Sequence, residues 1–69
     1  MQEELTATET DVLRMIVGGM SNKEIGFALD ISENKVEAYI KNIVGKIGAS
    51  DRASAATAAI EQGLVRIDL

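Results

Sequence analysis

Apolar residues recur along much of the chain at the three- to four-residue spacing of amphipathic helices. In the clearest case, within residues 32–47, four of them fall within a sector of about 60° at about 100° per residue. They are Val36, Ile40, Ile43 and Ile47. Strands are disfavoured, because aromatic residues make up only 3% of the chain. We predict an all-α, four-helix bundle-like domain with helices at about residues 6–18, 21–29, 32–47 and 51–62.

Short polar sequences mark the expected helix starts. Residues 6–9 and 21–24 both have the capping-box form, in which a hydroxyl bonds forward and a glutamate three residues later bonds back. The expected N-caps are Thr6, Ser21, Ser32 and either Ser50 or Asp51. The glycines expected to end helices are Gly18 with Gly19, Gly48 and Gly63. Other side chains expected to face inward are Ile25, Ala28, Leu29, Leu64, Val65 and Ile67.

Gly26 is unexpected inside the second helix, where glycine costs about 1 kcal/mol relative to alanine. One interpretation is that the second and third helices cross so closely that almost no side chain fits. The other is that a marginal helix simply tolerates glycine. Close packing is the interpretation that we prefer.

Composition excludes most catalytic and metal-binding chemistry. The 69 residues contain no His and no Cys, so the commonest general base, the commonest metal ligand and any thiolate are missing. We therefore predict that the protein is not an enzyme and needs no cofactor or metal. No apolar run approaches the roughly 20 residues of a membrane span, and no signal peptide is visible. These features predict a cytoplasmic protein without membrane contact.

The segment from Ser21 to Arg52 has the layout of a helix-turn-helix, in which the second helix enters the DNA major groove. Opposite its apolar stripe, the third helix carries Asn34, Ala38, Lys41 and Gly45, flanked by Glu37 and Asn42. Asparagine can pair with adenine, lysine can reach guanine or phosphate, and alanine can touch a thymine methyl. The amides of residues 21–23 at the start of the second helix suit a phosphate. An ordinary solvated helix face is the alternative.

The net charge of −4 is unusual for a nucleic-acid binder, which ordinarily has a basic surface. Its distribution is uneven, because residues 32–52 hold four bases against three acids and form the only net positive part. That part contains the third helix and the residues that follow it. The distribution of charge therefore agrees with a DNA contact at this helix, although the total does not favour one.

Residues spread along nearly the whole chain match one family in order and spacing. They are Leu5-Thr6, Glu9, Val12-Leu13, the runs 19–25 and 29–33, Val36, the run 46–49, Asp51-Arg52, Ala55 and the run 63–65. Through this ordered set the chain resembles the LuxR/GerE-type helix-turn-helix domain from Leu5 to Val65. The resemblance implies a single domain over residues 1–69 with its core at 5–65.

The resemblance implies the DNA-binding domain of a bacterial transcription regulator, as found in response regulators and quorum-sensing regulators. It also implies double-stranded DNA with an inverted repeat as the partner, and a contact with RNA polymerase, which is frequent in the family. A homodimer through the fourth helix would place Ser54 and Ala58 near the twofold axis. The candidate DNA-binding residues, from the polar face and from the resemblance together, are Asn22, Lys23, Asn34, Lys35, Glu37, Ala38, Lys41, Asn42 and Lys46.

The chain departs from the family at the start of the third helix. The family usually reads Thr-Val-Lys-x-His, whereas residues 35–39 here read Lys-Val-Glu-Ala-Tyr. Glu37 thus replaces a lysine. If that lysine met a phosphate, its loss lowers the slope of log affinity against log salt concentration by about 0.9. If it met a base, its loss costs roughly 1–3 kcal/mol of binding free energy. Glu37 can instead accept a bond from cytosine N4, and Lys35 adds a base nearby.

Two functions follow from these observations. The first is sequence-specific binding of double-stranded DNA as a bacterial transcription regulator, with residues 32–47 in the major groove. The second is a protein–protein interaction module that keeps the helix-turn-helix fold and has weakened DNA binding. The acidic balance and Glu37 motivate the second function.

Overall fold

The helices begin and end within one residue of the positions that the sequence predicts. The computed structural model describes residues 4–65, and within them no strand occurs. The helices are α1 (Ala7–Val17), α2 (Asn22–Leu29), α3 (Glu33–Ile47) and α4 (Arg52–Glu61). The predicted all-α fold with a helix-turn-helix is confirmed.

Side-chain caps account for the helix starts. Thr6 Oγ1 accepts a bond from the Glu9 amide at 3.1 Å, and the Thr6 amide donates to Glu9 Oε1 at 2.9 Å. Ser21 and Glu24 form the same reciprocal pair before α2. Ser32 caps α3 by accepting from the amide of Lys35 at 3.1 Å. All three predicted caps are confirmed.

Asp51, and not Ser50, caps α4. Its carboxylate accepts a bond from the Ser54 amide at 2.8 Å, and this bond holds the pKa of Asp51 below its ordinary value. Ser50 lies one residue outside the cap and its hydroxyl pairs instead with the hydroxyl of Ser54 at 3.3 Å. The structure thereby chooses between the two caps that the sequence left open.

Every helix contributes buried side chains to the core. Its buried members are Val12, Leu13, Ile16, Ile25, Val36, Ile43, Ile47, Ala55, Ala59 and Val65. Ile40, the fourth member of the predicted α3 stripe, is only partly buried. Beyond α4, Val65 is buried as predicted, whereas the inward prediction for Leu64 is wrong because this residue is 40% exposed. Ile67 lies outside the described residues. The apolar pattern therefore located most of the core.

Ala28 was predicted to face inward, and this prediction is wrong because its side chain is exposed. The buried residues of α2 are Ile25 and Gly26, so the packed face of the helix is centred between them. Ala28 lies about 110° around the helix from that centre, whereas Leu29 lies close to it and is partly buried. The position of Gly26 against its neighbours therefore sets the rotation of α2.

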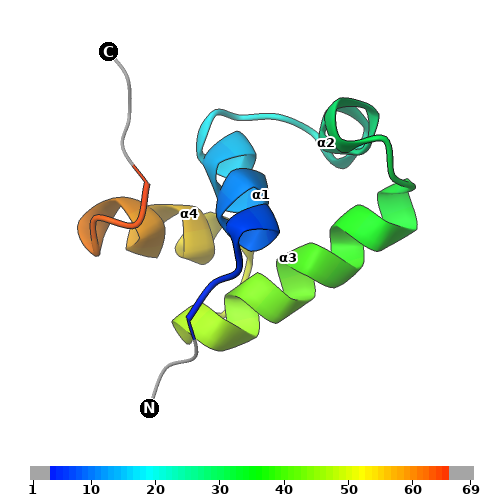
Figure 1. Ribbon diagram of the computed structural model, residues 1–69. Helices are drawn as coiled ribbons and strands as arrows, with labels where there is room; N and C mark the ends of the chain where they lie inside the picture. Colours follow the sequence, from blue (N-terminus) through cyan, green and yellow to red (C-terminus); the bar gives the residue numbers. More distant parts are fainter. Residues whose placement is uncertain (1–3, 66–69) are drawn as a thin grey trace.

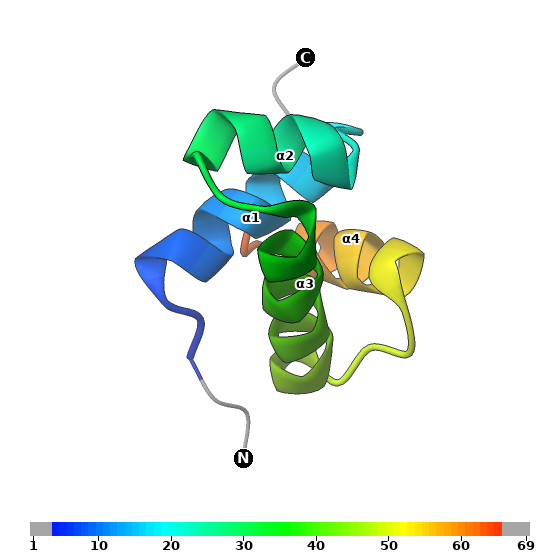
Figure 2. The same ribbon diagram turned by 90° about the vertical axis from the view of Figure 1, so that its right-hand side faces the viewer.

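α3 is the central helix of the domain. It packs against each of the other three helices, and α1 and α4 also pack against one another. Figures 1 and 2 show α2 lying crosswise over the N-terminal end of α3, while α4 flanks α3 nearer its other end. Within residues 4–65, none of the helices has the length and hydrophobicity of a membrane span.

Gly26 permits the tight turn between α2 and α3. A Cβ atom at this position would lie 2.7 Å from the carbonyl oxygen of Ile31 and 3.6 Å from Cγ2 of Val36. The Ile31 amide donates to the Gly26 carbonyl at 2.9 Å, and Asp30 between them has a left-handed backbone with φ of 57°. The lack of room for a side chain at Gly26 is thus confirmed, but it is imposed by the turn, whereas Val36 of α3 lies at an ordinary contact distance.

Substitution of Gly26 by alanine should destabilise the domain, although alanine favours helices. The added methyl group would clash with a backbone carbonyl, which has no rotamer to adopt, so we expect a net loss of about 1–2 kcal/mol in the free energy of unfolding. Urea denaturation of Gly26→Ala measures this loss.

Gly45→Ala is the matched control in α3, because a methyl group added at this position would meet no neighbouring element within 4 Å. This variant should gain up to about 1 kcal/mol from helix propensity alone. A gain of similar size in Gly26→Ala would show that the turn does not need the close approach.

Candidate nucleic-acid interface

A shallow surface groove lies beside the exposed face of α3. Its lining comes from α3, from the start of α2 and from the start of α4 with the residues before it. The lining residues are Asn22, Asn34, Glu37, Ala38, Ile40, Lys41, Val44, Ser50, Asp51 and Arg52. We call this surface the α3 groove. It brings together segments that lie about 30 residues apart in the sequence, since α2 begins at Asn22 and α4 at Arg52.

Five of the predicted DNA-binding residues line the α3 groove. They are Asn22, Asn34, Glu37, Ala38 and Lys41. Lys35 and Asn42 are exposed on α3 outside this lining, and Lys23 is exposed on α2, where it lines a different groove. The structure therefore gathers five of the nine predicted residues and leaves four outside the groove, the fourth being Lys46.

Arg52 holds the start of α2 in place. Its guanidinium donates one hydrogen bond to Oδ1 of Asn22 and another to the carbonyl of Met20. Because the fork of guanidinium donors is planar and rigid, these two bonds fix the start of α4 against the start of α2. Arg52 was not among the predicted site residues. The available signal was its place in the only net positive segment of the chain.

The charged side chains of the α3 groove are balanced. Glu37 and Asp51 contribute carboxylates, while Lys41 and Arg52 contribute cations. The groove is therefore locally neutral in a chain whose net charge is −4. A polyanion would meet less repulsion here than over the acidic remainder of the surface.

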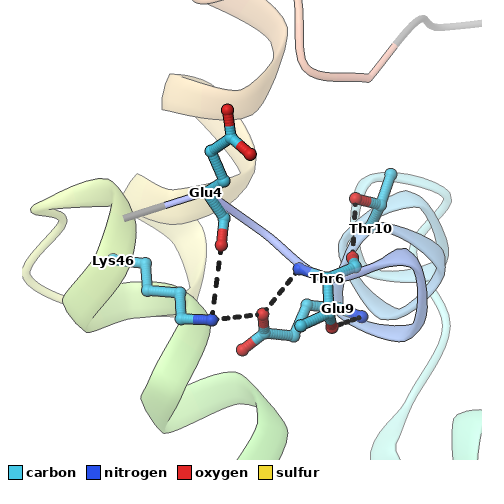
Figure 3. A network of polar contacts seen from close by, with 5 residues as sticks. All are labelled: Glu4, Thr6, Glu9, Thr10 and Lys46. Atoms are coloured by element: carbon cyan, nitrogen blue, oxygen red, sulfur yellow. Dashed lines mark hydrogen bonds and ion pairs between the residues drawn. The ribbon is translucent and has the colours of Figure 1, made fainter. Parts of the chain in front are cut away.

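Lys46 is engaged within the domain. Figure 3 shows its ammonium pointing toward Glu9, with Nζ 2.6 Å from Glu9 Oε1 and 3.4 Å from the Glu4 carbonyl oxygen. The Lys46 side chain is 20% exposed and that of Glu9 is 5% exposed. The contact of Lys46 with phosphate stays a prediction, but its charge is already matched by a buried carboxylate.

Glu9 remains charged because its bonds outweigh its burial. Burial raises the pKa of the carboxyl group, whereas the hydrogen bonds from Lys46 and Thr6 lower it, and the pKa falls below the ordinary value of 4.5. The same carboxylate closes the cap of α1, so one side chain joins the start of α1 to the last turn of α3.

Comparison with known proteins identifies the fold family. The family described as "Bacterial regulatory proteins, luxR family" matches residues 3–59. The chain belongs to the LuxR family of bacterial regulatory proteins. Its curated relatives are named as transcriptional regulatory proteins and not as enzymes, and the chain is a DNA-binding domain of the LuxR-family type.

Curated relatives are longer than the LuxR-family domain. The transcriptional regulatory protein YdfI of Bacillus subtilis is 37% identical over 67 residues, which cover 97% of this chain and 32% of YdfI. LiaR of the same organism is 43% identical over 63 residues, which cover 91% of this chain and 30% of LiaR. The chain thus spans about a third of the length of these relatives.

Solved structures share the same fold. The transcription factor GerE is 33% identical with a TM-score of 0.85, and the match covers 93% of this chain and 96% of GerE. A complex of Vibrio cholerae VqmA with ligand and DNA is 26% identical with a TM-score of 0.88, covering 99% of this chain and 30% of VqmA. These matches confirm the predicted family and fold.

The residues predicted for the dimer lie on the outer side of α4. Ser54 and Ala58 are both partly buried and line a shallow groove with Ala53, Thr57, Glu61 and Gln62. Most side chains on this face of the LuxR-family domain are short.

Among residues 4–65, no group of three or more metal-ligating side chains comes together.

Removal of the Lys46 ammonium should destabilise the LuxR-family domain in a pH-dependent way. In Lys46→Met the buried Glu9 carboxylate loses its cation, so near neutral pH we expect the free energy of unfolding to fall by roughly 1–3 kcal/mol. Because the folded pKa of Glu9 is lowered, the contribution of the pair is present above pH 4.5 and is lost as the pH falls through the folded pKa. Denaturant titrations from pH 7 to about pH 3 measure the difference from wild type.

Lys41→Met is the matched control, since Lys41 is an exposed lysine of the same helix. It should change stability by no more than about 0.5 kcal/mol across the pH range. A loss in Lys46→Met that stays constant down to acid pH would contradict the role given to Glu9.

Proposed function

We propose that this LuxR-family domain binds a specific sequence of double-stranded DNA and regulates transcription, with α3 in the major groove. The observation that supports it most is the α3 groove, where Asn22 of α2 and four predicted residues of α3 line one surface. A reading helix and the start of a second helix on one surface are what a helix-turn-helix needs to contact bases and phosphates together.

The α3 side chains divide into two roles in this proposal. Asn34, Ala38 and Lys41 face the bases, because they are exposed on the polar side of the helix and their chemistry matches adenine, thymine methyl and guanine. Glu37 lies among them and accepts a bond from cytosine N4, which redirects the preferred sequence.

Phosphate contacts come from the edges of the same surface. Lys35 on α3 and Lys23 on α2 are exposed cations outside the α3 groove, and Asn22 lies in the first turn of α2. The amides of a first turn lack partners within the helix backbone and favour an anion. These contacts set the orientation of α3 without reading the sequence.

A homodimer through α4 completes the proposed assembly. The short side chains of Ser54 and Ala58 allow two copies of the helix to approach closely. A twofold dimer presents two copies of α3 to successive major grooves, so the expected target is an inverted repeat. RNA polymerase would then be contacted by a surface that DNA leaves free.

Selection from random duplex DNA at two salt concentrations should enrich an inverted repeat. Lys41→Ala should weaken binding to the selected sequence by roughly 1–3 kcal/mol and relax the preference at one base pair, because Lys41 meets a base in this proposal. Fluorescence anisotropy titrations with matched and mismatched duplexes measure both effects.

Arg14→Ala is the control for Lys41→Ala, since Arg14 is an exposed base on α1 that does not line the α3 groove. Its affinity for the selected duplex should equal that of wild type. If no sequence is enriched even at low salt, the proposal fails for this domain. An interaction module with weakened DNA binding is then the better function, as the balance of acids and bases in the α3 groove suggests.

Glu37→Lys should raise the affinity for generic duplex DNA. The substitution replaces a carboxylate in the α3 groove by a cation, so it adds one phosphate contact. The slope of log affinity against log salt concentration should then become steeper by about 0.9. Binding isotherms over a range of salt concentrations measure that slope. An unchanged or weaker affinity for generic duplex DNA would mean that position 37 lies away from the phosphates or outside the interface.

A further inference from the structure

Phe27 on α2 is the most exposed large hydrophobic side chain of residues 4–65. Its side chain is 91% exposed, whereas the next two, Ile60 and Leu64, are each 40% exposed. It is the only phenylalanine in the chain. Phenylalanine has a lower helix propensity than alanine, and at this exposure it contributes little to the core. The stability of the fold therefore does not account for Phe27.

Phe27 belongs to a hollowed apolar surface and is not an isolated exposed residue. The surrounding groove is lined by Met20, Lys23, Glu24, Gly26, Phe27, Ala28, Asp30, Ile31 and Glu33, and we call it the Phe27 groove. Five of these nine residues are apolar. Single hydrophobic side chains are common on protein surfaces, whereas apolar residues grouped in a hollow and rimmed by polar ones mark interaction sites.

The Phe27 groove is separate from the α3 groove. The two surfaces have no lining residue in common. Around α2, Phe27 lies about 140° from Asn22, which lines the α3 groove. A molecule bound over Phe27 would therefore leave the face of α3 accessible.

The rim of the Phe27 groove is acidic. Its carboxylates come from Glu24, Asp30 and Glu33, against a single cation from Lys23. The pKa of Glu24 is held below its ordinary value by hydrogen bonds from Ser21, so this carboxylate is charged at neutral pH. A net charge of −2 repels nucleic acid and anionic lipid, and it attracts a cationic ligand.

A second copy of this chain is a poor match for this surface. The chain carries a net charge of −4, and residues 32–52, its only net positive part, reach just +1 and include the face of α3. A cationic segment with its own apolar side chains matches both the carboxylates and the aromatic ring. Burying a phenylalanine side chain contributes enough binding free energy to make Phe27 the anchor of such a contact.

We propose that the Phe27 groove is a docking site for a cationic, apolar helical or extended segment of a partner protein. The segment packs against Phe27 and places its lysines or arginines beside Glu24, Asp30 and Glu33. This site does not depend on base reading by α3, and the one residue that it shares with the proposed DNA contacts is Lys23 at its rim.

Three synthetic amphipathic peptides test the site by titration into the isotope-labelled domain, followed by amide chemical shifts. The first has leucines on one face and lysines on the other, the second has glutamates in place of the lysines, and the third has serines in place of the leucines. The first peptide should shift the amides of residues 23–33 around Phe27 and leave those of residues 37–45 unchanged. The other two should bind at least about tenfold more weakly, because each lacks one of the two contacts.

Phe27→Ala should lower the affinity for the first peptide about tenfold or more, since the anchor is removed. Its thermal midpoint should match that of wild type because the side chain is exposed. Ile60→Ala, which removes an exposed hydrophobic side chain from α4, is the matched control and should bind the peptide like wild type. Glu33→Gln should weaken binding without altering the helices.

Several results would overturn the docking site. Equal binding of the glutamate peptide, shifts centred on the face of α3, or full affinity in Phe27→Ala would each do so. Loss of DNA affinity in Phe27→Ala would assign the ring to the DNA interface, and loss of self-association would assign it to a second copy. Failure of DNA selection with intact peptide binding would leave the docking site standing and reject only the proposed DNA function.

Discussion

The close approach of the α2–α3 turn to Gly26 is the constraint on which the rest of the structure depends. The Ile31 carbonyl occupies space that any side chain at position 26 would need, and Asp30 adopts a left-handed backbone to bring the turn there. This contact sets both the rotation of α2 and its crosswise position on α3. Asn22 reaches the α3 groove and Phe27 faces outward as consequences of that one placement.

Two sets of polar contacts join helices elsewhere in the domain. Arg52 fastens the start of α4 to the start of α2, and the Lys46–Glu9 pair fastens the last turn of α3 to α1. Both cations come from residues 32–52, the only net positive part of the chain. Two of the four bases in this part, Lys46 and Arg52, are therefore engaged in contacts within the domain. The other two, Lys35 and Lys41, remain exposed.

This division of charge explains how an acidic domain belongs to a family of DNA-binding regulators. The α3 groove is locally neutral, and the excess of carboxylates lies elsewhere, including the rim of the Phe27 groove. α2 thus carries two surfaces of different chemistry, with polar Asn22 on one and apolar Phe27 on the other. A helix of only eight residues can serve both because its first turn faces α4 while its outer side meets solvent.

The sequence by itself determined the helices, the caps of the first three and the exposed face of α3, because these depend on residues within four positions of one another. Val36 and Ile43 could be placed in the core, and Lys41 on the outside, from periodicity alone. Only the tertiary structure decided that Ala28 is exposed, that Lys46 pairs with Glu9 and that Arg52 supports Asn22. The physical reason is distance along the chain: those two contacts join residues 37 and 30 positions apart, and helix packing alone brings them together.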